Sequence, residues 1–346
     1  MPVSRIDEAG LNVSQYGNRN LIINGAMQVA QRGTSSTGVN YKTVDRFRLD
    51  QNTMDELAFT QSQDTDAPAG FRNSYKLTVN TPEASLVLTE WLYMRYTMEG
   101  QDAQVLQFGQ STAQKTTMSF WVKSSVTGDY AVLFFNDQGS ARGQTLTYTV
   151  NAANTWEYKT IVFDGDTTQN FANSNAQGPD FYFTLSAGPD RTITDGTSWI
   201  NYTANASAYG QTADVATVNG ATWQITGVQL EVGDTATSFE HRSYGDELAR
   251  CQRYYETSSS VVNSVSAPNG PSYSAGTVVS RLTCFAAAKR ATPTIAETSV
   301  TVSGTSWVNA SPATSGTYGF SSLVQSSAGT NSYVDKNCIW AADAEL

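Results

Sequence analysis

Few residues of this chain are of the types that metal or nucleophilic chemistry requires. His241, in TSFEHRSYGDE, is the single histidine, and Cys251, Cys284 and Cys338 are far apart in the sequence. Because a zinc or other transition-metal site takes several imidazole or thiolate ligands, we predict no such site. We expect His241 to be a surface or linker residue and the cysteines to be small buried side chains, with a Cys284–Cys338 disulfide as an open alternative.

Two pairs of carboxylates have a spacing that could serve glycoside hydrolysis. Asp164 and Asp166 lie in FDGDTTQN, and Asp190 and Asp195 lie in GPDRTITDG. Hydrolysis needs two carboxyl groups a few ångströms apart in space, which sequence spacing does not establish. Acids so close together in turns more often solubilise a loop or bind Ca²⁺ weakly. The sequence contains no Gly-x-Ser-x-Gly elbow, phosphate loop or dinucleotide motif. We therefore expect no enzymatic activity and no cofactor, with a structural Ca²⁺ as the one exception considered.

Aromatic residues in two long polar segments are better candidates for binding. Residues 188–212 and 304–320 are rich in Asn, Ser and Thr, and loops of this length are usually functional or flexible. Aromatic faces stack on the apolar side of sugar rings, and neighbouring amides and hydroxyls can then recognise the sugar hydroxyls. Five residues are therefore candidate glycan contacts: Trp199, Tyr202, Tyr209, Trp307 and Tyr318. The alternative is that these rings pack against the fold itself.

Charge and hydropathy limit the partners of the chain. Its 31 acidic and 21 basic residues give a net charge of -10, and no basic run occurs. This argues against a nucleic-acid partner, which requires clustered Lys and Arg. The longest apolar stretches, such as YAVLFF, are far shorter than the about 18–20 residues that span a bilayer. The opening MPVSRIDEAGLNV lacks the apolar core of a secretory signal. We expect a soluble protein without membrane insertion.

Alternating apolar residues predict β-strands along the first 240 residues. In TTMSFWVKSS, Met118, Phe120 and Val122 share one face, and DYAVLFFND is apolar on both faces, as in an interior strand. Further strands are predicted at 155–163, 180–188 and 222–232. The last of these changes phase, which predicts a bulge around Gly227. No clear helical pattern separates the strands, so the fold class is an all-β sandwich.

The segment NLIINGAMQVAQRG, residues 20–33, predicts the first strand of this sandwich. Leu21, Ile23, Met27 and Val29 would share its inward face at a two-residue period. We expect this strand to lie beside the last one, TWQITGVQLEV, so that the two close a single jelly roll.

The stretch SYGDELARCQRYYE predicts a short helix. Ser243 and Asp246 have the spacing of a capping box, and Leu248, Cys251 and Tyr255 would fall on one face. We expect this helix to join two domains.

The expected organisation has four parts: an arm at 1–19, a jelly roll at 20–240, a helical linker at 241–256 and a C-terminal β-rich domain at 257–346. Between Thr257 and Asp335, 29 of 79 residues are Ser or Thr, and charged residues are few. This composition predicts a smaller β-sandwich. Its polar faces are either exposed or buried against copies of the same chain at a subunit interface, where hydroxyls pair with one another.

The sequence also resembles a known module. NLIINGAMQVAQRGTSSTGVNYKTVDRFRLD (20–50) resembles the start of a module of bacteriophage tail fibre and other virion appendage proteins. There, Asn-Leu-Ile-x-Asn-Gly is followed by Gln-Arg-Gly and then Asp-Arg-Phe or Asp-Arg-Trp. ITGVQLEVGDTATSFEHRSYGDELARCQRYYE (225–256) is similar to the end of that module, and SFWVKSS and NTWEYKTIVFDGD to its middle. The closing AADAEL resembles the close of many such chains. The resemblance covers residues 20–256 well and 257–346 weakly.

The resemblance implies a carbohydrate-binding-module-like jelly roll on a fibre that is usually a homotrimer. It implies a non-enzymatic virion protein, assembled in the host cytoplasm, that recognises a host-surface glycan. Residues 1–19 would attach it to other virion proteins. Weak single sites would gain avidity from the trimer. The alternatives are a capsid decoration, adapter or neck protein without receptor binding, and a polysaccharide depolymerase.

The shared motifs carry over no catalytic or sugar-binding residue, because they are strand and turn residues. Asn24–Gly25 is interpreted as structural, with Gly25 permitting close approach of the backbone. Residues 31–33 and Asp45–Arg46 are interpreted as buried polar partners, which predicts a contact between them.

Overall fold

The computed structural model of the protein describes residues 18–258, 260–267, 273–314, 316–329 and 333–346. The predicted arm therefore lies almost entirely outside the described residues. The chain divides into two compact units. The first contains the residues up to Gln28, Ser35–Asn40 and Phe47–Arg242, and the second contains Val29–Thr34, Tyr41–Arg46 and Ser243–Leu346. Two short segments of the expected jelly roll thus belong to the second unit, and so does most of the expected linker.

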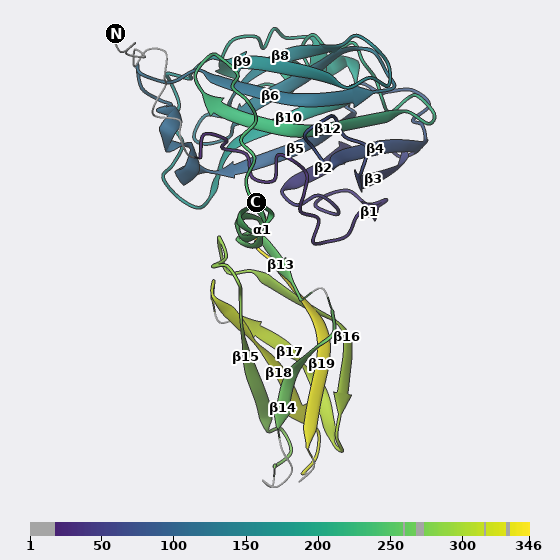
Figure 1. The fold of residues 1–346 in the computed structure, drawn as a ribbon, viewed down its shortest axis with the longest axis vertical. Helices are drawn as coiled ribbons and strands as arrows, with labels where there is room; N and C mark the ends of the chain where they lie inside the picture. The colour runs from purple at the N-terminus through teal and green to yellow at the C-terminus, as the bar shows by residue number, and fades with distance from the viewer. Residues whose placement is uncertain (1–17, 259, 268–272, 315, 330–332) are drawn as a thin grey trace, which may run out of the picture. The chain divides into compact units, whose positions relative to one another are not determined.

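The first unit is a sandwich of two antiparallel six-stranded sheets, whose strands overlap in the view of Figure 1. Sheet 1 has the order β1 (Ser35–Ser36), β3 (Ala58–Asp64), β4 (Ser74–Thr81), β12 (Thr222–Val232), β6 (Thr116–Ser124), β9 (Glu157–Phe163). Sheet 2 has the order β11 (Ile200–Asn201), β8 (Arg142–Val150), β7 (Gly128–Asn136), β10 (Gln177–Ala187), β5 (Trp91–Glu99), β2 (Phe47–Asn52). Strands β4 to β7 alternate between the sheets, as in a jelly roll. Short 3-10 helices lie in the connections: η2 (Gly100–Leu106), η3 (Pro189–Thr192) and η4 (Ala204–Ala206).

Aromatic side chains from both sheets fill the space between them. The ring centroids of Phe120 in β6 and Phe183 in β10 lie 5.4 Å apart, and those of Phe134 in β7 and Phe163 in β9 lie 5.5 Å apart. Phe120 is fully buried, as are the two other residues predicted on its face of the strand, which confirms that prediction. Burial of one such side chain stabilises a fold by about 1.5–3 kcal/mol. This aromatic layer therefore holds the two sheets together and fixes the position of their outer faces.

The two segments expected to close the sandwich do lie side by side. The Leu21 amide donates to the Leu230 carbonyl at 2.9 Å, and the Val228 amide donates to the Gly25 carbonyl at 2.9 Å. The Asn20 side chain contributes as well, because its Nδ2 donates to the Val228 carbonyl and its Oδ1 accepts from the Leu230 amide. The predicted adjacency is confirmed.

The first of these segments, however, is not a β-strand. Asn24 and Met27 have φ angles of 61° and 55°, so the backbone turns where an extended strand was expected. The two-residue alternation is lost as a result. Ile22 is fully buried, whereas Leu21 and Ile23, which were predicted to face inward, are half-buried.

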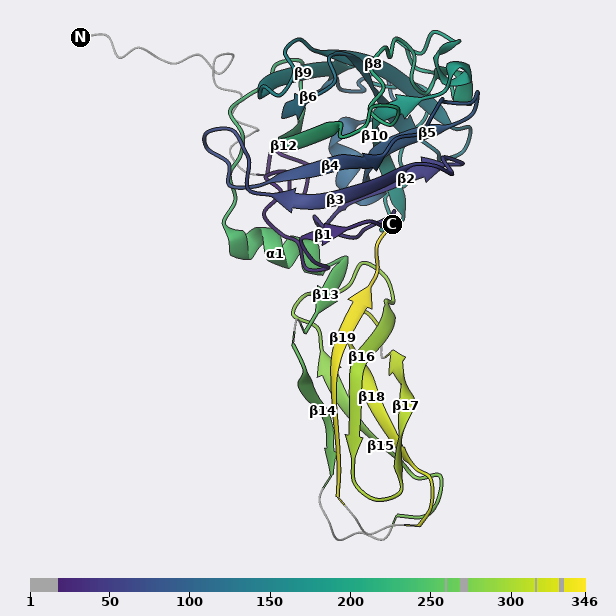
Figure 2. The same ribbon diagram turned by 90° about the vertical axis from the view of Figure 1, so that its right-hand side faces the viewer.

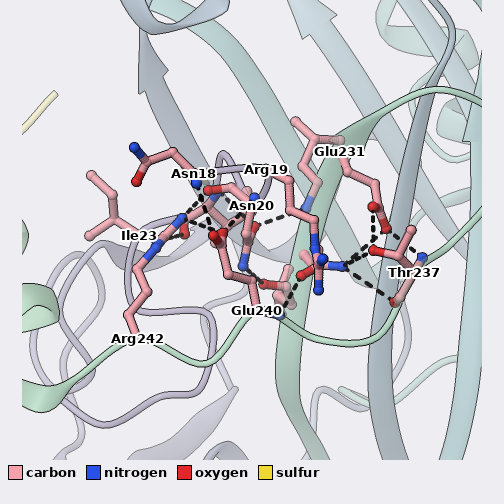
Figure 3. A network of polar contacts seen from close by, with 12 residues as sticks. Asn18, Arg19, Asn20, Ile23, Glu231, Thr237, Glu240 and Arg242 are labelled. Atoms are coloured by element: carbon pink, nitrogen blue, oxygen red, sulfur yellow. Dashed lines mark hydrogen bonds and ion pairs between the residues drawn. The ribbon is translucent and has the colours of Figure 1, made fainter. Parts of the chain in front are cut away.

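A polar network fixes this irregular segment (Figure 3). The Glu240 carboxylate accepts hydrogen bonds from the amides of Asn18 and Asn20, each at 2.9 Å. The Arg242 guanidinium donates to the carbonyls of Asn20 and Ile22, the latter at 3.0 Å. Side chains thus provide the hydrogen-bond partners that a neighbouring strand would provide to an extended backbone.

The predicted bulge in β12 is present. The register between β12 and β6 shifts between Thr226 and Gln229, and Gly227 has a φ of 63°. A Cβ on Gly227 would lie 2.6 Å from the ring of Phe71, so glycine is also required by this packing. The bulge keeps both halves of β12 facing the core, as the change of phase in the sequence indicated.

Gly25 is held against β12 so closely that a methyl group cannot be added without movement. A Cβ at this position would lie 2.0 Å from the Val228 carbonyl oxygen. We expect Gly25→Ala to lower the free energy of unfolding of the first unit by about 1–3 kcal/mol, as overpacking does. Urea denaturation measures the change. Gly245→Ala, in α1 (Tyr244–Gln252), is the control, since nothing lies within 4 Å of its added Cβ. Equal stability of the two variants would contradict the close approach.

The second unit is a smaller β-sandwich, as predicted (Figure 2). In one sheet β19 (Val334–Asp343) pairs with β13 (Tyr255–Thr257), β14 (Val262–Ala267) and β16 (Thr294–Ser303). The other sheet has the order β15 (Val278–Cys284), β18 (Gly319–Ser326), β17 (Trp307–Thr314). Among its described residues, buried apolar side chains form one cluster of Val265, Trp307, Val324 and Val334 and another of Phe320, Trp340 and Ala342.

Helix α1 begins where the sequence predicts. The Ser243 hydroxyl accepts from the Asp246 amide at 3.2 Å, which confirms the N-cap. Within the helix, Glu247 and Cys251 are buried and Leu248 is half-buried. The predicted face is thus confirmed at Cys251 but wrong at Tyr255, because the helix ends at Gln252 and Tyr255 opens β13.

The two N-terminal segments of the second unit contribute charged side chains to it. The Gln31 amide and its side-chain Nε2 donate to the Asp45 carboxylate at 3.0 and 2.6 Å, so the predicted contact between these motifs is confirmed. Arg32 pairs with Glu345 at 3.4 Å, and Arg46 pairs with Glu345 as well. Burial raises the pKa of Asp45 to about 6, even though Arg32 acts in the opposite direction. We call Arg32, Asp45, Arg46 and Glu345 the arginine–carboxylate cluster.

All three cysteines are free, so the alternative of a Cys284–Cys338 disulfide is not realised. Cys251 and Cys338 are buried, as expected, but Cys284 is exposed at the end of an outer strand. Within the described ranges, no helix has the length and apolar content needed to cross a bilayer.

Candidate functional site

The outer face of sheet 2 carries an aromatic platform. Trp91 and Tyr93 project from β5 and alternate with the buried Leu92 and Met94. The rings of Trp91 and Tyr93 are stacked, with centroids 4.0 Å apart and planes 11° apart. The ring of Tyr182, on β10, meets Tyr93 edge-on at 4.6 Å. The three rings thus form contiguous aromatic surface outside the core, in which Trp91 and Tyr93 cover one face of each other.

The polar segment 188–212 forms the wall of a pocket over this platform. Its residues Arg191, Tyr202, Ser207 and Ala208 line the pocket together with side chains of β5, β7 and β10, and the enclosed volume is about 210 Å³. Tyr202 packs against Phe135 of β7 with ring centroids 4.6 Å apart. The segment is attached to the sheet through β11, the edge strand, which pairs with β8. We call this site the platform pocket.

A buried carboxylate holds the platform strands together. Asp180, fully buried on β10, accepts from Arg95 Nε at 2.9 Å, from Thr97 Oγ1 at 2.5 Å and from Gln177 Nε2 at 3.0 Å. The Tyr182 hydroxyl donates to the same carboxylate at 3.0 Å. Burial raises the pKa of Asp180 in spite of the opposing effect of Arg95. This network fixes the orientation of the Tyr182 ring in the pocket.

The phenol groups of the pocket keep their protons at neutral pH. Burial raises the pKa of Tyr93, Tyr182 and Tyr202, and for Tyr202 it outweighs the lowering effect of the Arg191 charge. A protonated phenol both donates and accepts hydrogen bonds. With the hydroxyls of Thr184 and Ser207 in the lining, the pocket combines apolar ring faces with neutral polar groups.

The candidates from segment 188–212 take three different positions. Tyr202 lines the platform pocket. Trp199 packs onto the sandwich instead, since its ring lies 5.5 Å from Phe108 and 5.0 Å from Phe134, and its Nε1 donates to the Asp164 carbonyl at 2.6 Å. Tyr209 is half-buried and is not part of the lining.

The two candidates from segment 304–320 lie in the second unit and do not form a common site. Trp307 is only 7% exposed and belongs to an apolar cluster, with its ring 5.0 Å from that of Tyr273. Little of this side chain is therefore accessible, and its contact with a glycan stays a prediction. Tyr318 is 74% exposed.

Sequence reasoning missed Trp91, Tyr93 and Tyr182. The signal is nonetheless present in WLYMRY, the start of β5, where Trp, Tyr and Arg alternate with Leu, Met and Tyr. An aromatic stripe opposite an apolar stripe indicates a strand whose apolar face is buried and whose aromatic face is exposed. Segment 180–188 was predicted as a strand, but its outward Tyr182 was not singled out.

His241 lies in a second, more open groove. It is exposed, and its ring centroid lies 5.3 Å from that of Phe71 and 4.9 Å from that of Phe239. The groove has a volume of about 440 Å³, and Trp121 and Tyr158 of sheet 1 also line it. The histidine is thus a surface residue with aromatic neighbours.

Three of the four acids in the two carboxylate pairs have structural partners. Asp166 is buried and accepts from Arg142 Nε at 2.7 Å, while Asp164 is an ion-pair partner of Lys115 at 3.1 Å. Asp195 accepts hydrogen bonds from the amide and hydroxyl of Thr197, which lower its pKa. Among the residues that the structure describes, no group of three or more His, Cys, Asp or Glu side chains could hold a metal ion.

No protein-family model matches the sequence, and no curated protein matches it. Among solved structures, the chain is similar to the enzymatically active domain of tailspike protein 4 of bacteriophage CBA120, with 14% identity and a TM-score of 0.35 over 62% of this chain and 21% of that chain. It is also similar to a CBM4 structure, with 11% identity and a TM-score of 0.32 over 60% and 97% of the two chains. A third is the family 11 carbohydrate-binding module of the cellulosomal cellulase Lic26A-Cel5E of Clostridium thermocellum, with 8% identity and a TM-score of 0.29 over 60% and 98%. The matched part of the chain spans about a fifth of the length of the tailspike chain and nearly the whole length of the two carbohydrate-binding modules.

Proposed function

We propose that the first unit binds glycans at the platform pocket, without catalysing a reaction on them. The observation that carries this proposal is the pair of stacked rings of Trp91 and Tyr93, with Tyr182 and Tyr202 completing the pocket. Ring faces of this kind cover the apolar side of a sugar. The protonated phenols and the hydroxyls of Thr184 and Ser207 can exchange hydrogen bonds with sugar hydroxyls.

The size of the pocket supports recognition of a short stretch of glycan. Its volume of about 210 Å³ lies below the range of about 300–1,000 Å³ that is usual for small-molecule sites. We therefore expect a single site to be weak. Several linked copies would bind a repetitive surface far more tightly than one, because later contacts form at high effective concentration.

We further propose that the chain is part of a bacteriophage appendage, a tail fibre or similar structure, that contacts the host surface as a homotrimer. The motifs of residues 20–50 and 225–256 support this placement in the virion, and avidity would compensate for a weak single site. Residues 1–19, of which 1–17 lie outside the described residues, are proposed to contact other virion proteins.

Substitution of the platform rings tests the glycan proposal. A glycan array identifies ligands of the full chain, and isothermal titration calorimetry then measures the affinity of the best one. We expect Tyr93→Ala to weaken binding at least about tenfold, because removal of one stacking face costs about 1.5 kcal/mol.

Tyr158→Ala is the matched control, since Tyr158 is 45% exposed on the other sheet and lies outside the platform pocket. Thermal melting of both variants checks the fold. Equal affinity of the wild type and Tyr93→Ala, or loss of binding in Tyr158→Ala alone, would count against the platform pocket.

A further inference from the structure

One cationic side chain in the platform pocket has no carboxylate partner. Arg191, on η3, lines the pocket beside Tyr202. Its Nη2 donates to the Thr89 carbonyl at 2.8 Å, while its Nε is buried and has no hydrogen-bond partner among the residues that the structure describes. Burial of an unsatisfied donor on a charged group is costly, so such groups in native structures usually have a reason.

The other arginines on this face of sheet 2 are neutralised. Arg95 is paired with the buried Asp180, and Arg48 of β2 is paired with Asp50 at 2.7 Å. Across the described part of the chain, no ion pair includes Arg191. In a protein with a net charge of -10, this is a local positive charge placed beside aromatic faces.

We propose that the ligand of the platform pocket carries a carboxylate, as a uronic acid residue does, and that Arg191 pairs with it. This inference rests on the proposed glycan binding. The sugar ring would lie against Trp91 and Tyr93, and the carboxylate would point to the guanidinium. An arginine forms charge-assisted and often bidentate hydrogen bonds with a carboxylate, which add geometric selectivity. The pocket would thus select acidic sugars over neutral sugars of the same shape.

Matched pairs of oligosaccharides test this assignment. Tetrasaccharides of glucuronate, galacturonate and mannuronate are each compared with their carboxyl-reduced forms, which keep the ring and lose the charge. Sulfated tetrasaccharides form a third arm. With the full chain, calorimetry at 150 mM NaCl should show at least one uronate binding about tenfold or more tighter than its reduced form, as expected for hydrogen bonds to a charged group.

Variants at Arg191 then test whether this residue causes the preference for a uronate over its reduced form. Arg191→Gln should remove the preference, so that a uronate and its reduced form bind this variant with similar affinity, and Arg191→Lys should keep part of it. Arg72→Gln is the matched control, because Arg72 is an exposed arginine of the same unit outside the pocket. Thermal melting confirms that each variant is folded.

The outcomes separate the two proposals. If reduced forms bind as tightly as uronates, the acidic-sugar inference fails while glycan binding stands. If sulfated probes bind tighter than every uronate, the carboxylate assignment fails. A preference that survives in Arg191→Gln removes the role of this residue. If no probe in the panel or on a wider glycan array binds, the proposed function fails together with the inference.

Discussion

Glu345→Ala should be among the most damaging single substitutions in the second unit, lowering its free energy of unfolding by about 3–5 kcal/mol. The side chain of Glu345 is 5% exposed and pairs with both Arg32 and Arg46. Arg46 is fully buried, and its guanidinium lies 3.4 Å from the ring centroid of Tyr254. Removal of the carboxylate takes the counter-charge of Glu345 away from this buried guanidinium. Breaking a buried pair in this way costs far more than the net contribution of the pair.

Hydrogen exchange provides the measurement, because it reports on each unit separately. Amides of β13 and β19 should exchange faster in Glu345→Ala, while those of sheet 1 should be unaffected. Asp343→Ala is the control, since Asp343 pairs with the same Arg32 at 3.1 Å but is 48% exposed. A surface pair contributes at most about 1 kcal/mol. Similar protection in the two variants would show that the arginine–carboxylate cluster does not stabilise the unit as argued.

Asp180→Ala should both destabilise the first unit and weaken its pocket. The substitution removes the acceptor for Arg95, Thr97, Gln177 and Tyr182 at once. We expect a loss of about 3–5 kcal/mol in the free energy of unfolding, since Arg95 is left largely buried without a counter-charge. Glycan affinity should also fall, because the Tyr182 ring is no longer held by its hydroxyl.

Urea denaturation and calorimetry measure the two effects. Asp55→Ala is the control, since Asp55 is an exposed aspartate of the same unit, and a surface substitution of this kind changes stability by no more than about 0.5 kcal/mol. Asp180→Asn keeps the shape and part of the hydrogen bonding, so it should lie between the two. A stable Asp180→Ala variant with unchanged glycan affinity would contradict the role given to this carboxylate.

Local sequence patterns predicted the features that depend on residues close together in the chain. The phase change in β12 indicated the bulge at Gly227 because strand alternation is strict, and Ser243 indicated the start of α1 because capping involves residues three apart. The segment at Asn24 was mistaken for a strand because apolar spacing does not reveal a positive φ. Its backbone is satisfied by side chains of Asn20 and Glu240, and no periodic pattern encodes such partners.

The site was predicted only in part for a related reason. Tyr202 was found because it lies in a long polar segment, yet Trp307 lies in a similar segment and is buried. Composition does not distinguish a ring that lines a pocket from one that packs beneath it. Trp91 and Tyr93 were missed because aromatic residues in a strand normally indicate the face that packs in the core. In β5 the core face is the opposite one.

The division of the second unit between distant parts of the chain has a consequence for its synthesis. Arg32 and Arg46 are separated from Glu345 by 313 and 299 residues. At a translation rate of about 5–20 residues per second, these arginines wait about 15–60 s on the ribosome before their carboxylate exists. The sandwich of the first unit can fold during that interval, whereas the second unit, to which residues 29–34 and 41–46 belong, can be completed only after Glu345 has been added. Expression of residues 243–346 alone would omit these two segments of the second unit.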